Sequence, residues 1–185
     1  MREIRIHGRG GQGSLVLAQF MAIAALEDGK YGQAFPFLGG GGERRGKAIM
    51  AFFRLDDKPI RIRCRVDEPD CVIVQDPTIL DELDVESGLK DGGIILVNTD
   101  KDPADLRLSK ASFRVFTIFA DELARKILGR PIINTALLGA FAGVTKALTL
   151  QASIDAVISR FPGELGKKNA RIVEESYRSV MERLS

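Results

Sequence analysis

The chain of 185 residues has few of the side chains that metal and redox centres require. It contains two cysteines, one histidine and no tryptophan. An iron–sulfur cluster normally takes four thiolates, and a structural zinc ion takes four cysteine or histidine ligands. The sequence therefore predicts that the chain brings no metal chemistry of its own. Cys64 and Cys71 lie in apolar or alternating segments, so we expect two core or near-core thiols without a disulfide.

Long apolar runs and a large excess of one charge are also missing. The formal net charge is +2, which gives no support for binding to nucleic acid or to a membrane surface. The longest apolar run, residues 136–150, is interrupted by Gly139, Gly143 and Lys146, so it does not read as a transmembrane span. The chain does not open with a basic segment followed by an apolar one, as an export signal would. We therefore expect a cytoplasmic protein that forms one domain over residues 1–185.

The most informative segment is the motif His7-Gly8-Arg9-Gly10-Gly11-Gln12-Gly13. A short alternating run precedes it at residues 3–6, and a run of helix formers follows from Ser14 to Glu27. A strand, a glycine turn and a helix in this order bring several backbone N–H groups and the positive end of a helix dipole to one point. The sequence therefore predicts a Rossmann-like turn that can bind an anion through its backbone.

Several ligands remain open for this turn. Gly8, Gly10 and Gly13 have the G-x-G-x-x-G spacing of dinucleotide sites, which also use an acidic residue about 20 positions further on. Residues 32–36 contain no carboxylate, which argues against free NAD. The alternatives are another phosphate-bearing ligand such as coenzyme A, a carboxylate of a partner, and a purely structural role in which the glycines allow tight packing.

Side chains of the turn could also take part in binding. Gln12 and Ser14 can donate hydrogen bonds to an oxyanion, and Ser14 is equally well explained as the N-cap of the following helix. His7 has no serine, cysteine or aspartate beside it in a catalytic arrangement, so we expect a hydrogen-bonded structural histidine rather than a general base. The acidic residues occupy turns and strand ends, and no pair is placed for acid–base catalysis.

A second glycine-rich cluster, Gly39 to Gly42, is followed by Arg44 and Arg45. Consecutive glycines carry a large conformational entropy, and guanidinium groups bind carboxylates and phosphates through paired N–H donors. Two interpretations remain open. The segment is either a solvated loop or a loop that becomes ordered against a partner subunit or an anionic ligand.

The periodicity of the remaining chain predicts alternating strands and helices. Residues 60–66 alternate apolar side chains with arginines, as in a half-exposed strand that forms a hairpin around the turn 56–59. Residues 71–74 and 94–97 are continuous apolar runs, as in central strands covered on both faces. The expected strands are 3–6, 31–37, 48–55, 60–66, 71–74, 94–97 and 114–119, and the expected helices are 14–27, 121–128, 134–148, 153–161 and 164–184. This order predicts an α/β fold, a three-layer α/β/α domain with a mixed, mainly parallel sheet and a helical C-terminal third.

The helices carry signals about their ends and their packing. The helix from Ser14 is apolar on almost every side, so it must be covered on a second side by another helix or another chain, and Gly29 is placed to end it. Asp121 is placed to be the N-cap of a later helix. Gly139 and Gly143 lie inside an apolar helix, which predicts close packing against a neighbour.

The chain resembles the gamma subunits of the 2-oxoacid:ferredoxin oxidoreductases, called pyruvate synthases when pyruvate is the substrate. The likeness begins at the glycine motif and covers nearly the whole chain in order. It continues through Gln33-Ala34-Phe35-Pro36, Glu43-Arg44-Arg45-Gly46, Phe53-Arg54, Glu68-Pro69-Asp70, Gln75-Asp76, Val97-Asn98-Thr99 and Asn134-Thr135-Ala136-Leu137-Leu138-Gly139-Ala140. The run Gly39 to Gly42 is longer than the family pattern, so the geometry of that loop does not follow from the resemblance.

The resemblance implies a multi-subunit enzyme that oxidatively decarboxylates a 2-oxoacid, forms an acyl-CoA and CO2, and passes electrons to ferredoxin. The pattern is closest to pyruvate-type members. It implies alpha, beta and delta subunits, or fused equivalents, as partners. Thiamine diphosphate, magnesium and the iron–sulfur clusters then belong mainly to those subunits, and this chain is inactive alone. We expect the chain to complete the assembly and to help hold coenzyme A through Gly8, Arg9, Gly10, Gly11, Gln12, Gly13, Ser14, Arg44 and Arg45.

A stand-alone nucleotide-binding module of Rossmann type is the competing hypothesis. Such a module would bind NAD or an adenine nucleotide tightly by itself. A subunit would instead co-purify with larger chains that carry thiamine diphosphate and iron–sulfur clusters. The missing ribose carboxylate and the match along the whole chain favour the subunit.

Overall fold

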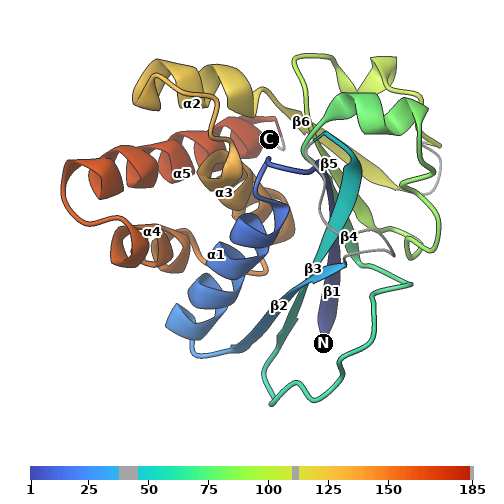
Figure 1. Ribbon diagram of the computed structural model, residues 1–185, viewed down its shortest axis with the longest axis horizontal. Coiled ribbons are helices and arrows are strands. Elements are labelled where there is room, and N and C mark those ends of the chain that lie inside the picture. The colour runs from blue at the N-terminus through green and yellow to red at the C-terminus, as the bar shows by residue number, and fades with distance from the viewer. Residues whose placement is uncertain (38–45, 110–112, 184–185) are drawn as a thin grey trace.

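The computed structural model describes residues 1–37, 46–109 and 113–183. Its central feature is a six-stranded sheet with the strand order β2-β3-β1-β4-β5-β6 (Figure 1). The strands are β1 (Arg2–Arg9), β2 (Tyr31–Phe37), β3 (Ala48–Asp56), β4 (Cys71–Val74), β5 (Ile94–Asn98) and β6 (Arg114–Ile118). The helices are α1 (Ser14–Glu27), α2 (Ala120–Leu128), α3 (Asn134–Thr145), α4 (Leu150–Arg160) and α5 (Glu164–Glu182), with two short 3-10 helices, η1 (Pro77–Asp81) and η2 (Pro103–Asp105).

The sheet is mixed, and its pairing changes at β1. On one side β1, β4, β5 and β6 pair in parallel, with Ile6 opposite Ile73 and Ile73 opposite Leu96. On the other side β3 pairs antiparallel with both β1 and β2. The strand β3 therefore lies between β1 and β2, although the chain passes from β1 through α1 to β2. The expected α/β fold with a mixed, mainly parallel sheet is confirmed.

The two faces of the sheet are covered by different kinds of structure. The five α-helices lie on one face, where Ile4, Ile6 and Phe53 of the sheet join the same core as Leu17 of α1 and Phe141 of α3 (Figure 1). The other face carries a second core formed by Val72, Val74, Ile79, Val85, Leu89, Ile95, Val97 and Leu106. In the described residues this third layer consists of 3-10 helices and loops in place of α-helices. It nevertheless buries β4 and β5 on both faces, as their apolar runs predict.

The apolar helix α1 is covered on more than one side, as its sequence requires. It packs against β2 and β3 of the sheet and against the neighbouring helices α3 and α4. Gly29 ends the helix with a left-handed φ of 70°. The N–H of Gly29 donates to Leu26 O at 2.9 Å, and that of Lys30 donates to Ala25 O at 2.8 Å. This pattern satisfies the last carbonyls of the helix, and the predicted stop is confirmed.

The two glycines of α3 lie where this helix approaches α5. A Cβ atom at Gly139 would collide with the carbonyl oxygen of Val173 and with the hydroxyl of Ser176. A Cβ atom at Gly143 would lie 2.5 Å from Val180 Cγ2. The absence of side chains at these positions therefore permits the close approach of α3 and α5, as predicted.

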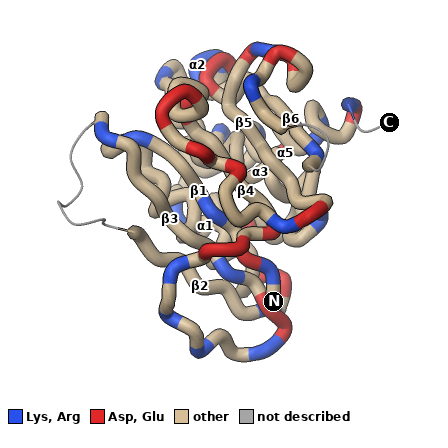
Figure 2. The backbone as a smooth tube through the Cα atoms, turned by 90° about the vertical axis from the view of Figure 1, so that its right-hand side faces the viewer, with Lys and Arg blue, Asp and Glu red and all other residues tan. Residues whose placement is uncertain are grey.

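Residues 60–66 do not form the expected strand. They belong to a loop between β3 and β4 that extends below the sheet, and its basic positions stand out in Figure 2. The physical reason is that β3 already has β1 on one edge and β2 on the other, so no edge is left for a hairpin partner. The alternating side chains Arg61, Arg63 and Arg65 are exposed in this loop.

A buried arginine fixes this loop through hydrogen bonds that replace those of the expected strand pairing. The Arg54 side chain is 1% exposed and forms an ion pair with Glu3, with Nε and Oε1 2.7 Å apart. Its guanidinium also donates to the carbonyl oxygens of Cys64 at 2.8 Å, Arg65 at 3.3 Å and Ile62 at 3.4 Å. One side chain thus supplies hydrogen-bond donors to backbone carbonyl oxygens that have no partner strand in the sheet.

Several expected element ends are shifted. The helix α2 begins at Ala120, so Asp121 lies in its first turn and the N-cap prediction is wrong. The helix α3 ends at Thr145, because Lys146 adopts a left-handed φ of 52°. The helix α4 begins at Leu150, because the Thr149 hydroxyl oxygen accepts the N–H of Ala152 at 3.1 Å and caps it there.

The two cysteines differ in their environment. Cys71 is buried, as expected, whereas Cys64 is exposed, so the prediction of a near-core thiol is wrong for Cys64. Cys64 is exposed because it belongs to the loop at residues 60–66, which does not pair with the sheet.

The helix α5 is described to Glu182, and Leu184 lies outside the described residues. Within the described residues, no helix is long and apolar enough to cross a membrane.

Candidate functional site

The glycine turn connects the carboxyl end of β1 to the first turn of α1 (Figure 1). Gly11 and Gly13 have φ angles of 96° and 74°, which L side chains rarely adopt. Gly8 approaches a neighbour closely, since a Cβ there would collide with the side chains of Gln75 and Ser14. Gly10 joins the end of the sheet, where its N–H donates to Lys47 O at 2.9 Å. The predicted strand, turn and helix are therefore present.

The first turn of α1 leaves backbone donors available. Leu17 is the first residue whose N–H bonds back into the helix, to Gly13 O at 3.0 Å. The N-cap is Gly13, and no side chain caps the helix. Among the described residues, the N–H groups of Ser14, Leu15 and Val16 have no hydrogen-bond acceptor. Such donors at a helix N-terminus, together with the helix dipole, favour an anion.

Ser14 has a different role from the predicted cap. Its hydroxyl lies 2.5 Å from Gln75 Oε1, and Gln75 Nε2 donates to Asn134 Oδ1 at 3.1 Å. All three side chains are buried. They link the start of α1, the end of β4 and the start of α3. The N-cap prediction for Ser14 is therefore wrong, because its hydroxyl forms part of a buried polar chain.

Arg9 and Gln12 are also engaged inside the protein. The Arg9 guanidinium pairs with Glu82 at 2.6 Å and with Asp76 at 3.2 Å. The hydrogen bond from Arg9 lowers the pKa of the Glu82 carboxyl. Gln12 Oε1 accepts the N–H of Arg9 at 2.7 Å, while its amide nitrogen donates to Asp76 at 3.3 Å. These contacts fix the shape of the turn, so the donors left for a ligand are mainly those of its backbone.

A cavity of about 370 Å³ opens beside this turn. Gly11, Gln12 and Gly13 form one wall, and Asn134, at the start of α3, belongs to another. Arg125 and Asp121 of α2 contribute one positive and one negative side chain. The cavity is thus next to the N-termini of two helices and lies at the carboxyl end of the parallel strands, where α/β sheets bind ligands.

A second set of hydrogen bonds holds the rim of this cavity. Asn98, at the end of β5, donates from Nδ2 to Gln75 O at 2.9 Å and to Asp121 Oδ2 at 2.7 Å. Its Oδ1 accepts the N–H of Ala120 at 3.0 Å, which fixes the start of α2. One buried amide therefore positions the helix that carries Arg125.

Gly8 to Ser14 form the turn, whereas the side chain of His7, the residue before it in β1, is buried and engaged elsewhere. His7 is 4% exposed and accepts a hydrogen bond at Nε2 from Arg5 Nε at 3.0 Å. Burial and the Arg5 charge lower the pKa of His7 to about 4, so its imidazole is neutral at pH 7. The expected hydrogen-bonded structural histidine is confirmed. Arg44 and Arg45 lie outside the described residues.

Sequence reasoning missed Arg125, and it did not predict the contacts that join Ser14, Gln75 and Asn134. Gln75 directly follows β4, and Asn98 is the last residue of β5. Polar side chains directly after apolar strands are the signal that could have found them, because parallel strands end at a common edge. No comparable signal marks Arg125, which lies in the last turn of α2. Among the described residues, no group of three or more histidine, cysteine or carboxylate side chains is placed to hold a metal ion.

Known proteins are similar to this chain in sequence and in structure. The family described as pyruvate ferredoxin/flavodoxin oxidoreductase matches residues 3–179. The pyruvate synthase subunit PorC of Methanocaldococcus jannaschii is 48% identical over 183 residues, which cover 99% of each chain. The common subunit gamma of the pyruvate/ketoisovalerate oxidoreductases of Thermococcus kodakarensis is 48% identical and is also matched over 98% of each chain.

A solved structure of a related subunit has the same fold as this chain. The crystal structure of the pyruvate oxidoreductase subunit PORC from Thermotoga maritima superposes with a TM-score of 0.81 at 38% identity. The match covers 96% of this chain and 95% of that one. The sequence match and the structural match thus both extend over almost the whole chain. The chain therefore belongs to the pyruvate ferredoxin/flavodoxin oxidoreductase family, among its gamma subunits.

Proposed function

We propose that this gamma subunit completes a cytoplasmic oxidoreductase that decarboxylates pyruvate or a related 2-oxoacid, forms the acyl-CoA and CO2, and passes electrons to ferredoxin. The observation that carries the proposal is the match to pyruvate synthase and pyruvate/ketoisovalerate oxidoreductase subunits over at least 98% of each chain. The partners are alpha, beta and delta subunits or fused equivalents. The chain enters this assembly as one domain over residues 1–185.

The other subunits carry the electron-transfer and decarboxylation chemistry in this proposal. Two cysteines and one histidine fall short of the four thiolates that an iron–sulfur cluster normally takes. We therefore assign the clusters, thiamine diphosphate and magnesium to the partner chains. The isolated gamma subunit is inactive on this account.

We infer that the glycine turn helps the complex to hold coenzyme A. Coenzyme A carries phosphate groups, and the turn offers the free N–H groups of Ser14, Leu15 and Val16 beside a cavity of about 370 Å³. Arg125 lines the same cavity and adds a guanidinium. Arg9 contributes by holding the turn, since its own guanidinium is paired with Asp76 and Glu82. Arg44 and Arg45 follow β2 in sequence, outside the described residues, and we assign them to the same role because their guanidinium groups can bind phosphate.

The topology argues against the competing role of a stand-alone NAD module. In a dinucleotide site the second strand lies next to the first, and its end carries the ribose-binding carboxylate. Here β3 lies between β1 and β2, which moves the end of β2 to about 10 Å from β1, twice the usual strand spacing. The segment Gly32 to Pro36 also offers no carboxylate.

A coenzyme A titration of the reconstituted complex tests this role. We expect the double variant Arg44→Ala/Arg45→Ala, and separately Arg125→Ala, to raise the KM for coenzyme A about tenfold or more, because each removes charge-assisted hydrogen bonds. The kcat at saturating coenzyme A should change little. Arg160→Ala, at the end of α4 and far in sequence from the turn, is the matched control and should leave the KM unchanged. An unchanged KM in both test variants would remove coenzyme A binding and leave assembly as the role.

A further inference from the structure

A second cavity lies at the opposite edge of the sheet, where the parallel strands begin. Arg2, Cys71, Ile94 and Arg114 are the first residues of β1, β4, β5 and β6, and all four line a space of about 300 Å³. Because β1 is eight residues long, this edge is roughly 25 Å from the glycine turn. The cavity is therefore separate from the proposed coenzyme A site and does not depend on it.

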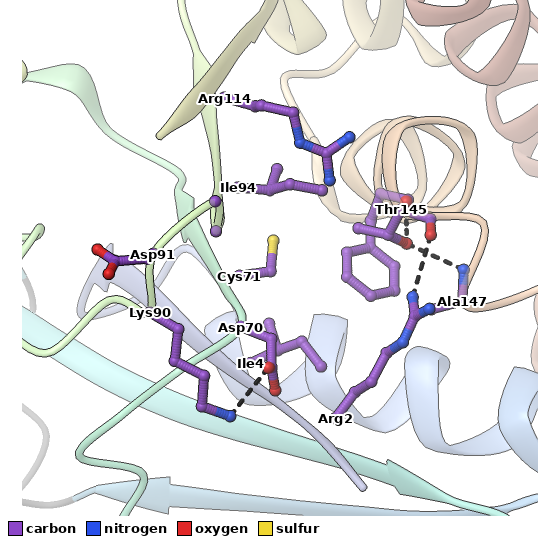
Figure 3. Close-up of a pocket in the computed structure, with 13 residues that line it drawn as sticks. Arg2, Ile4, Asp70, Cys71, Lys90, Asp91, Ile94, Arg114, Thr145 and Ala147 are labelled. Carbon is purple, nitrogen blue, oxygen red and sulfur yellow. Dashed lines mark hydrogen bonds and ion pairs between the residues drawn. The ribbon is translucent and has the colours of Figure 1, made fainter. Parts of the chain in front are cut away.

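The inner wall of this cavity is apolar. Ile4, Cys71, Ile94 and Phe141 line it, and each is at most 5% exposed. Figure 3 shows the Cys71 sulfur with Ile94 above it and Ile4 below it. Burial raises the pKa of the Cys71 thiol well above its usual range, so the sulfur is neutral and adds to the apolar surface. This wall suits a hydrocarbon group.

The rim of the cavity is cationic. The side chain of Arg114 has no ion-pair or hydrogen-bond partner among the described residues, and Figure 3 shows its guanidinium over the cavity. Arg2 donates one hydrogen bond to the Thr145 carbonyl oxygen at 3.0 Å, and no carboxylate in the described part of the chain pairs with its guanidinium. The two arginines thus flank the apolar wall.

The acidic residues of the rim do not cancel these charges. Asp70 pairs with Lys90 at 2.9 Å, and its second oxygen accepts the N–H of Glu3 at 2.7 Å. Asp91 points away from the cavity in Figure 3. Asp70 and Lys90 neutralise each other, so the remaining charges that face the cavity are those of Arg2 and Arg114.

We propose that this cavity binds a small aliphatic carboxylate, with its carboxylate group on Arg114 beside Arg2 and its hydrocarbon group against Ile4, Cys71, Ile94 and Phe141. A guanidinium binds a carboxylate through two parallel N–H donors, and Arg114 has these donors free. At about 30 Å³ for each water-sized volume, the cavity holds roughly ten non-hydrogen atoms, which fits a branched acid of four to six carbons. The site is a binding site distinct from the reaction that the complex catalyses.

The test uses 3-methylbutanoate as the probe and the full chain labelled at the isoleucine methyl groups. We expect titration to shift the methyl signals of Ile4 and Ile94, which report directly on the wall of the cavity. Acetate should bind at least about tenfold more weakly, because it lacks the buried methyl groups. The neutral 3-methylbutanamide should also bind at least about tenfold more weakly, because it lacks the charge that Arg114 recognises.

Two variants with one arginine removed complete the experiment. Arg114→Gln should weaken 3-methylbutanoate binding about tenfold or more, while Arg107→Gln removes an arginine whose side chain is 88% exposed and should leave it unchanged. The proposal is overturned if the Ile4 and Ile94 signals do not move, if the amide binds as tightly as the acid, or if both variants behave alike. Equal binding of acetate would overturn the apolar half of the site.

Discussion

The one histidine of the chain is buried beside an arginine and carries no charge at neutral pH. Arg5 Nε donates to His7 Nε2, so the imidazole proton resides on Nδ1. Nδ1 has no hydrogen-bond partner among the described residues. Arg5 itself is held by the carbonyl oxygens of Val85 at 3.0 Å and Ser87 at 2.6 Å. A second proton on His7 would therefore place an extra charge next to a fixed cation.

This environment predicts a loss of stability in acid. The pKa of His7 is about 4 in the folded chain, against about 6.5 in the unfolded chain, so the unfolded chain binds the proton first as the pH falls. The stability is fully present above pH 6.5 and is lost progressively between pH 6.5 and 4. Lowering the pH from 7 to 4 should reduce the free energy of unfolding by about 3 kcal/mol through His7 alone. Urea unfolding followed by circular dichroism measures this change.

The variant His7→Gln isolates the contribution of the imidazole. Its amide oxygen can still accept the Arg5 hydrogen bond, but it does not titrate. Since the chain has no other histidine, the difference between the two pH profiles belongs to His7. Parallel profiles for the two proteins would contradict the account.

Residue roles were predictable where the backbone decides them and unpredictable where distant side chains decide them. The positive φ angles at Gly11 and Gly13 follow from a local strand-turn-helix pattern. The role of Ser14 depends on Gln75, which is 61 positions away, and no local rule connects the two. Arg54 likewise holds carbonyl oxygens of a loop whose position depends on the order of the strands. Polar side chains that bridge elements require the tertiary structure to be known first.

At the scale of elements, the contact between α3 and α5 gives a sharp test. Gly139→Ala would raise helix propensity by about 1 kcal/mol, but its Cβ would meet the backbone carbonyl of Val173, which cannot move away alone. We expect a net loss of about 2 kcal/mol in the free energy of unfolding. Gly143→Ala meets Cγ2 of the Val180 side chain and should cost less. Urea unfolding of both variants shows directly which one loses more of the free energy of unfolding.

The outcome that contradicts this packing is specific. If helix propensity alone decided the result, both alanine variants would be as stable as the parent chain or more stable. A neutral or stabilised Gly139→Ala variant would mean that α3 and α5 lie further apart than described. An equal loss in both variants would mean that the Val173 carbonyl is no harder to displace than the Val180 side chain.

The predicted elements succeeded where periodicity and burial agree, and failed where the sheet order decides. The helix from Ser14 to Glu27 and the strand from Tyr31 to Phe37 were predicted with their observed ends. Residues 60–66 have an equally regular alternation, yet they form a loop, because both edges of β3 are occupied. A period of two indicates a segment with two different sides, and it does not tell whether a neighbouring strand is available to pair.

At the scale of the whole molecule, β3 changes what a Rossmann-like start can bind. The order β1, α1, β2 follows the sequence of a dinucleotide-binding unit, but β3 separates the two strands that would share the cofactor. The fold keeps the unpaired backbone N–H groups at the start of α1 and lacks the strand neighbour that a ribose site requires. This combination is consistent with the proposed contact to the phosphate groups of coenzyme A and not with a stand-alone dinucleotide site. The fold class followed from the sequence, whereas the insertion of β3 between β1 and β2 did not, because pairing between distant strands leaves no local signal.

We infer that the chain works only as part of the oxidoreductase complex. The most direct measurement is the rate of pyruvate oxidation, with coenzyme A and ferredoxin present, for the purified chain alone and for the complex recovered from native extract through a tag on this chain. We expect no turnover by the chain alone, and turnover by a complex that contains larger chains with thiamine diphosphate and iron–sulfur clusters. Turnover by the solitary chain, or recovery of the tagged chain as a monomer without partners, would contradict it.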